Sequence, residues 1–149
     1  MSEARLLRSV QRLATALAKQ ERQTAAAAGI SVSQMRILLT LDSQGIEGMR
    51  ISDLADEQGL AVSTMTRNLA LLELKGWARR MPGAEDKRTV RVALSLTGKD
   101  LAARLSNTNV ARFSQAFREF HPSDRVERAV ALDRVAQAIE RIGDEPDKP

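Results

Sequence analysis

The first 28 positions of the chain place apolar residues on one face of a helix. Arginine and lysine occupy the other faces, whereas residues three or four positions apart are apolar, namely Leu6, Val10, Leu13 and Leu17. This spacing predicts an amphipathic helix that begins at Glu3, continues to about Ala28 and is ended by Gly29.

The next stretch predicts three further helices. Ser31 and Gln34 have the spacing of a capping box, so a second helix is expected to begin there. Ser52 is expected to cap a short third helix that ends at Gly59, and a fourth helix begins near Ser63. Two short helices joined by a glycine-containing turn are typical of a helix-turn-helix.

Strand patterns surround this pair of helices. Residues 49–51 predict a minimal strand, and residues 77–81 and 89–96 predict two longer ones around a turn at Pro82 and Gly83. In the last strand, apolar residues alternate with others and are expected to share one face: Val90, Val92, Leu94 and Leu96.

The C-terminal part predicts two more helices. Thr97 and Asp100 suggest the start of a long one, which Pro122 breaks. Ser123 is expected to cap a final helix that ends at Gly143. Its apolar residues lie on one side, namely Leu132, Val135, Ala136, Ile139 and Ile142.

The net charge is concentrated between Lys75 and Arg91. This window holds six basic and two acidic residues, an excess of four. The whole chain has 23 basic and 19 acidic residues, so the remainder is neutral. A positive charge confined to one hairpin is typical of a surface that meets a polyanion such as nucleic acid.

Composition excludes several other classes of protein. The chain has no cysteine, which excludes disulfides, thiolate zinc sites and thiol nucleophiles. Neither an apolar run of membrane length nor a signal-peptide pattern is present, so we expect a cytoplasmic protein without membrane contact. No glycine-rich phosphate loop, metal-ligand cluster or nucleophile–base pair is legible, and the single His121 is expected in a loop. We therefore expect no enzyme, metal or cofactor.

The fourth helix has one face suited to a DNA groove. Its wheel places Val62, Met65, Leu69 and Leu72 toward the core. Small hydroxyl side chains and one arginine lie near its N-terminus, at Ser63, Thr64, Thr66 and Arg67. Hydroxyls bind phosphate, and arginine can hold a guanine edge through two hydrogen bonds.

The hairpin tip carries a second candidate contact. Lys87 and Arg88 follow Asp86, whose carboxylate is expected to hold the Arg88 guanidinium extended for a narrow minor groove. Arg79, Arg80 and Arg91 are expected to support these residues with their charge and with phosphate contacts.

Several motifs together resemble one known family. They are I-S-x-x-Q from Ile30, S-T-M-T-R from Ser63, K-G-W-x-x-R from Lys75, D-K-R from Asp86 and V-x-L-S-L-T from Val92. This set resembles the MarR (multiple antibiotic resistance regulator) family of winged helix-turn-helix transcription factors. One departure is that Ala70 and Leu71 stand where the family often has charged residues.

The resemblance implies a mainly α fold with a small β-wing. It also implies separate regions of the chain for dimerisation and for DNA binding. Residues 1–30 form an N-terminal dimerisation helix, 31–98 the DNA-binding lobe, 99–143 C-terminal dimerisation helices and 144–149 a disordered tail. The expected partners are a second copy and a palindromic operator in double-stranded DNA. The apolar stripes of the two terminal helices, left over once the lobe has closed its core, favour the same homodimer.

The resemblance also implies an effector, a small aromatic carboxylate or other anion, whose binding releases a repressor from DNA. The expected cleft lies between the second and fifth helices, near Met35, Leu38, Phe113 and Phe117, with Arg22 or Arg36 at its mouth to pair a carboxylate. The sequence leaves two alternatives open: a winged-helix module for protein–protein assembly, and a regulator that needs no ligand.

Overall fold

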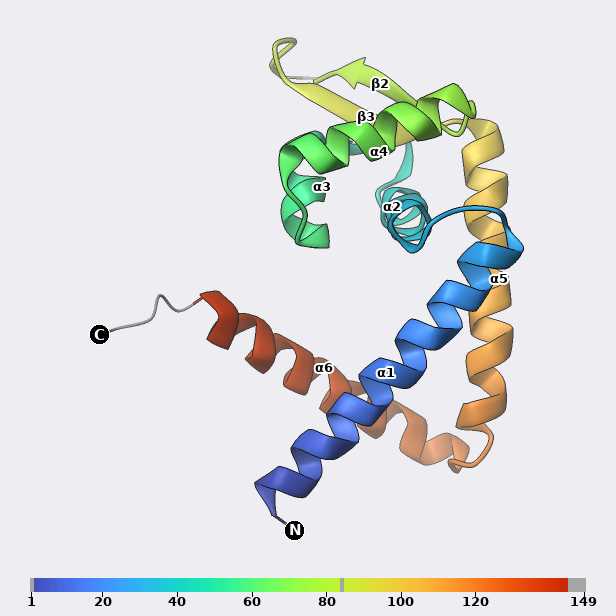
Figure 1. Cartoon of the computed structure of the whole chain (residues 1–149), viewed down its shortest axis with the longest axis vertical. Coiled ribbons are helices and arrows are strands. Elements are labelled where there is room, and N and C mark those ends of the chain that lie inside the picture. Colours follow the sequence, from blue (N-terminus) through green and yellow to red (C-terminus); the bar gives the residue numbers. More distant parts are fainter. Residues whose placement is uncertain (1, 84, 145–149) are drawn as a thin grey trace. The chain divides into compact units, whose positions relative to one another are not determined.

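The computed structural model describes residues 2–83 and 85–144, and it confirms a mainly helical fold with a small sheet (Figure 1). The chain forms two compact units, Met1–Asn109 and Val110–Pro149, which divide inside one long helix. The domain boundaries expected from the sequence stay predictions. Of the expected tail, position 144 still belongs to the last helix, and 145–149 lie outside the described residues.

The helices and strands follow the order α1, α2, η1, β1, α3, α4, β2, β3, α5, α6. The helices are α1 (Glu3–Ala27), α2 (Val32–Ser43), α3 (Ile51–Gln58), α4 (Val62–Leu74), α5 (Leu96–Phe117) and α6 (Pro122–Asp144), with a short 3-10 helix η1 (Gly45–Glu47). The strands are β1 (Met49–Arg50), β2 (Ala78–Pro82) and β3 (Val90–Leu94).

The three strands form one antiparallel sheet in the order β1-β3-β2. In the β2–β3 hairpin, Arg80 pairs with Val92 and Pro82 pairs with Val90. On the other side of β3, Arg50 of β1 pairs with Arg91. The hairpin is therefore the wing, and β1 attaches it to the chain segment just before the helix-turn-helix.

The core of the first unit combines α2, α3, α4 and the sheet. Its largest fully buried side chains come from all of them: Met35, Ile37, Leu38, Leu41, Leu54, Met65, Leu69, Leu72 and Val92. The predicted capping box is confirmed, because the Gln34 backbone N–H donates to Ser31 Oγ at 3.1 Å and the Gln34 side chain accepts from the Ser31 N–H at 3.0 Å.

The starts of three helices, α3, α5 and α6, differ from the predictions, and at α5 the cap is Ser95 and not Thr97. Helix α3 begins at Ile51 after Arg50, so Ser52 lies inside it. Helix α6 begins at Pro122, whose fixed φ suits a first helical position, and the backbone N–H of Ser123 lies 3.4 Å from His121 Nδ1. The residue before each helix, rather than the small polar residue inside it, thus stands at the cap.

The predicted strand 89–96 also ends earlier than expected. Leu96 is the first residue of α5 and is 81% exposed, because Ser95 ends the strand and caps the helix by accepting the Gly98 N–H at 3.1 Å. Of the four alternating residues, only Val92 and Leu94 are buried, and Val90 is half exposed. The alternating pattern correctly predicted the position of the strand, but the predicted range was too long and included the first residue of α5.

A tight approach at Gly48 holds β1 against β3. Gly48 has φ +62°, and a Cβ there would lie 1.9 Å from the carbonyl oxygen of Val92. Only glycine fits both the backbone conformation and the space. The pairing of β1 with β3 therefore requires glycine at position 48.

Gly48→Ala is expected to lower the free energy of unfolding by about 3 kcal/mol or more, because strain and a backbone clash add. Gly45→Ala is the matched control, since Gly45 has φ +69° but no atom within 4 Å of the added Cβ. It should cost only about 1 kcal/mol. Urea unfolding of both variants measures the difference, and equal losses would mean that the close approach contributes nothing.

Candidate nucleic-acid interface

Helix α4 is fixed in the lobe by one buried side. Met65, Leu69 and Leu72 are fully buried, whereas Ser63, Thr64 and Arg67 are exposed on the opposite side. Thr66 lies between the two and is half-buried. Val62 was expected in the core but is 52% exposed, because the first turn of α4 extends beyond the packed interior.

The N-terminus of α4 has unused hydrogen-bonding capacity. Its cap residue, Ala61, supplies no side-chain acceptor, so the backbone N–H groups of the first turn receive no cap from it. These groups carry the positive end of the helix dipole, which favours an anion such as phosphate. In Figure 1 this end of α4 and the turn of the β2–β3 hairpin lie toward the same side of the lobe.

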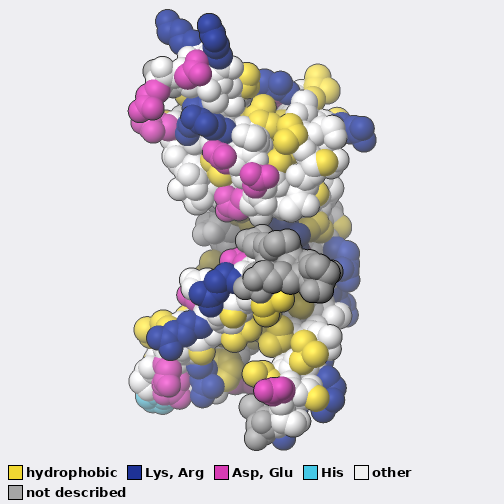
Figure 2. Space-filling model, turned by 90° about the vertical axis from the view of Figure 1, so that its left-hand side faces the viewer, with side chains coloured by type: hydrophobic (Ala, Val, Ile, Leu, Met, Phe, Trp, Pro, Cys, Tyr) yellow, Lys and Arg dark blue, Asp and Glu magenta, His cyan; other side chains and the backbone are white. Residues whose placement is uncertain are grey.

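The wing tip is folded by Asp86. Its carboxylate accepts the backbone N–H of Arg88 at 2.9 Å, and its carbonyl accepts the N–H of Thr89 at 3.0 Å. The predicted contact of Asp86 with the Arg88 guanidinium is not among the ion pairs of the described residues. Asp86 shapes the turn instead, and the Lys87 and Arg88 side chains are exposed. Figure 2 shows basic side chains projecting from the upper end of the molecule, where the hairpin lies.

The three supporting arginines differ in what they contact. Arg79 is exposed on β2, and Arg80 Nε donates to Glu73 Oε1 of α4 at 2.7 Å. Arg91 is half-buried, and its guanidinium donates to the carbonyl oxygens of Glu47 at 3.0 Å and Gly48 at 2.7 Å. Arg80 therefore ties the wing to α4, and Arg91 ties it to the turn before β1.

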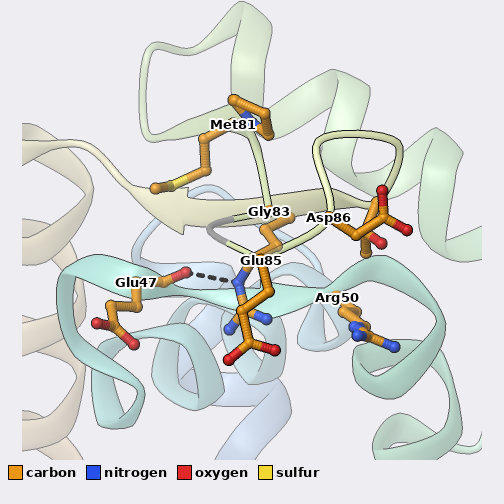
Figure 3. A pocket seen from close by; sticks show the side chains of 9 residues that line it. Glu47, Arg50, Met81, Gly83, Glu85 and Asp86 are labelled. Atoms are coloured by element: carbon orange, nitrogen blue, oxygen red, sulfur yellow. Dashed lines mark hydrogen bonds between the residues drawn. The ribbon is translucent and has the colours of Figure 1, made fainter.

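A hollow of about 270 Å³ lies between the wing and the segment around β1 (Figure 3). Its labelled residues come from the turn before β1, from β1 and from the hairpin: Glu47, Arg50, Met81, Gly83, Glu85 and Asp86. Arg50 was not expected here, because a single arginine before a helix is no signal by itself. It brings another exposed cation next to the wing.

The residues expected around an effector are in different settings. Met35 and Leu38 are fully buried in the core of the first unit. Phe113 and Phe117 stack in the second unit, with ring centroids 6.3 Å apart. The described residues form one hollow beside the wing and another along α1. None of these four side chains lines either of the two hollows.

The two arginines of that site also differ. Arg22 is exposed on α1, whereas Arg36 forms a two-pronged ion pair with Glu21, including a hydrogen bond of 3.2 Å from Nε to Oε1. The hydrogen bond to Glu21 raises the pKa of the Arg36 guanidinium above its ordinary value. No sequence pattern indicated this pair, whose partners lie on different helices.

The described residues show neither a metal site nor a single membrane-spanning helix. Within 2–83 and 85–144, no group of three or more His, Asp or Glu side chains gathers to hold a metal ion. In the same ranges no single helix is long and apolar enough to cross a membrane, and α1 with α2 meets that criterion only as a pair bent by 90°.

Comparison with known proteins agrees with this geometry. Residues 30–90 match the model of the MarR family, and this range holds both the helix-turn-helix and the wing. The chain is 26% identical over 111 residues to the uncharacterized HTH-type transcriptional regulator YfiV of Bacillus subtilis, covering 74% of this chain and 68% of that protein.

Solved structures share the fold. One is NadR in complex with 4-hydroxyphenylacetate, with a TM-score of 0.75 and 23% identity over 87% of this chain and 89% of that one. Another is a point mutant of S. aureus MepR bound to an oligodeoxyribonucleotide, with a TM-score of 0.61 and 16% identity over 93% and 99% of the two chains.

The motifs first noted in the sequence, the winged helix with its basic face and the matched relatives agree with one another. The winged helix-turn-helix lobe, over residues 30–90, matches the MarR family, and the chain is similar to HTH-type transcriptional regulators.

Proposed function

We propose that this protein is a homodimeric repressor that binds a palindromic operator and releases it when a small aromatic or anionic effector binds. The observation that carries this proposal is the exposed face of α4, where Ser63, Thr64 and Arg67 stand beside a helix N-terminus that lacks a side-chain cap. A face that offers donors and a positive dipole, opposite a fully buried one, is suited to a groove of DNA.

Each exposed residue has a distinct role in this proposal. Ser63, Thr64 and Thr66 hold phosphates or base edges at the start of α4, and Arg67 reads a base in the major groove. Lys87 and Arg88 enter the minor groove at the wing tip, in a turn that Asp86 keeps folded. Arg79 and Arg80 add positive field and phosphate contacts.

Arg91 contributes through the position of the wing. Its guanidinium is held by two backbone carbonyls, which leaves less of it for a phosphate than the sequence suggested. We assign to it the placement of β3 relative to β1, and hence of the wing tip relative to α4. The two roles can be distinguished by the salt dependence of DNA affinity, because only the loss of a phosphate contact reduces that dependence.

The exposed apolar side chains of the terminal helices support a dimer. On α1, Leu6 and Leu13 are 49% and 42% exposed. On α6, Leu132 and Ile139 are 48% and 53% exposed, and none of the described side chains of this helix is buried. An amphipathic helix gains most of its stability from packing its apolar face, so these faces favour a second copy as their cover. A two-fold dimer reads two-fold-related half-sites, and a repressor covers such a site against polymerase.

An effector site near α1 and α2 has two supports. The Thr24 hydroxyl is buried without a hydrogen-bond partner among the described residues, one turn after Glu21. A buried unpaired hydroxyl costs about 1–3 kcal/mol, which a polar ligand atom would recover. In addition, NadR, a structure of the same fold, was solved with a small aromatic carboxylate. Within the first unit, Arg22 and Arg36 remain the proposed anion partners and Met35 the apolar one, whereas Phe113 and Phe117 belong to the second unit and stay a separate prediction.

Arg67→Ala and Arg88→Ala should each weaken specific DNA binding by about 1–3 kcal/mol per site, the scale of one lost arginine contact. Arg67→Ala should also relax the preference at one base position per half-site, because that side chain reads a base edge. The measurement is fluorescence anisotropy with a site selected from random duplexes.

Two control variants make this test specific. Arg5→Ala removes an exposed charge from α1 and should leave affinity unchanged. Arg91→Gln should weaken binding while the slope of log K against log salt stays the same, whereas loss of a phosphate contact reduces that slope by about 1. Equal losses in all four variants would mean that only bulk charge matters, and salt-independent or absent binding would favour a protein-assembly module.

Ile139→Glu is expected to convert a dimer into a monomer, because it places a charge in the apolar face of α6. Sedimentation equilibrium should then give 16.4 kDa for the variant and twice that mass for the unaltered chain. Ile46→Glu is the control, since Ile46 is 67% exposed in η1, outside both terminal helices. A monomeric unaltered chain at micromolar concentration would refute the dimer.

A small aromatic carboxylate should raise the melting temperature of the free protein and lower its affinity for operator DNA. Such release requires tighter binding to the conformation that does not hold DNA, since equal affinity for both shifts nothing. A thermal-shift screen of benzoate and phenylacetate derivatives, repeated with operator present, measures both effects. Arg36→Ala should abolish the response, and a hit that leaves DNA affinity unchanged would contradict the coupling.

A further inference from the structure

The exposed side of α4 changes character along its length. We call four exposed residues on this side the groove face: Ser63, Thr64, Arg67 and Leu71. The first three are polar, whereas Leu71 is apolar and 46% exposed; Leu74, which is 83% exposed at the end of the helix, lies beyond this face. Leu71 follows Arg67 by four residues, so it stands one helical turn further along the same side.

Leu71 has no place in the protein's own core. The core cluster and the side chains packed against it include Leu69 and Leu72 of the same helix but not Leu71. A single exposed leucine is ordinary on a protein surface. Here, however, the leucine continues the face that the proposed function turns toward base edges.

Major-groove base edges present one kind of apolar group. Adenine, guanine and cytosine offer hydrogen-bond donors and acceptors, and only thymine adds a methyl group. A leucine placed against cytosine or a purine would take polar atoms out of water without pairing them, which is unfavourable. Against thymine it covers the methyl group, which is favourable in proportion to the apolar area buried.

We propose that Leu71 determines part of the sequence specificity by contacting the C5 methyl group of a thymine in each half-site. This inference rests on the proposed function of α4. Four residues advance an α-helix by about 6 Å, and base pairs rise by about 3.4 Å, so the thymine lies within about two base pairs of the base that Arg67 contacts. Leu74, the last residue of α4, lies a further turn from the N-terminal end that enters the groove.

The experiment removes the methyl group from the DNA alone. A site selected from random duplexes is synthesised with each thymine replaced in turn by deoxyuridine, and the affinity of the full-length protein is measured for each duplex. One thymine per half-site should show a loss of about fourfold, the scale of one buried methyl-sized group. Leu71→Ala should bind the unmodified site more weakly and should lose this thymine-over-uracil difference, as in a double-mutant cycle.

The controls separate this inference from the proposed function. Leu74→Ala, a matched change of an exposed leucine at the end of the same helix, should keep the full thymine-over-uracil difference. Melting temperatures of both variants report whether they fold. If Leu71→Ala keeps the difference at every thymine, or if the unaltered protein shows none, Leu71 does not read a methyl group, while DNA binding that depends on Arg67 still upholds the proposed function. Absence of specific DNA binding would overturn both.

Discussion

The rotation of α4 about its own axis is the constraint on which the rest of the interface depends. Met65, Leu69 and Leu72 are fully buried, and burial of such a side chain stabilises the fold by about 1.5–3 kcal/mol each. Turning the helix by one residue would move it by about 100° and would exchange buried leucine for polar side chains. The buried residues of α4 therefore determine which of its residues are exposed and can form the interface.

The outer part of the wing depends on a different kind of constraint, because the buried apolar residues of the hairpin, Ala78, Val92, Ala93 and Leu94, lie at the end of the strands away from the tip. Polar contacts attach it at two points, Arg80 to Glu73 of α4 and Arg91 to the carbonyls of Glu47 and Gly48. At the tip, the Asp86 carboxylate holds the turn through the backbone N–H two residues later. Because the Arg80 and Glu73 side chains are 40% and 29% exposed, their ion pair contributes only about 0–1 kcal/mol, so such contacts fix the position of the wing more than its stability. Arg80 and Arg91 thus position the wing, and the exposed cations at its tip are free for the proposed contact with DNA.

The sequence predicted those features that depend on residues close together in the chain. The capping box at Ser31 and the glycine end of α3 at Gly59 were predicted, because they depend on residues three or four positions apart. The hairpin and its basic face were predicted for the same reason. Periodicity failed at Val62 and Leu96, since it does not show where the core stops.

Contacts over longer distances left no such signal. The partners of Arg91 lie 43 and 44 residues away, and Glu21 lies 15 residues from Arg36, so no local pattern could reveal either contact. From the sequence, Arg91 was assigned a phosphate contact because of its charge, and Arg36 was assigned a carboxylate effector through the family resemblance. The structure shows that each is already engaged within the protein, which changes what an external ligand must displace.

The pair of Glu21 and Arg36 also limits how a signal can pass from α1 to the lobe. It joins α1 to α2, whose Met35, Ile37 and Leu38 form the core on which α4 rests. Because the Arg36 side chain is 51% exposed, the pair contributes only about 0–1 kcal/mol. Reversing a population from 99:1 to 1:99 takes about 5.5 kcal/mol. Breaking this pair alone would therefore not supply the free energy of the proposed release of DNA, and the proposed ligand would also have to act on the apolar contacts between α1 and α2, where Thr24 and Ala25 are buried.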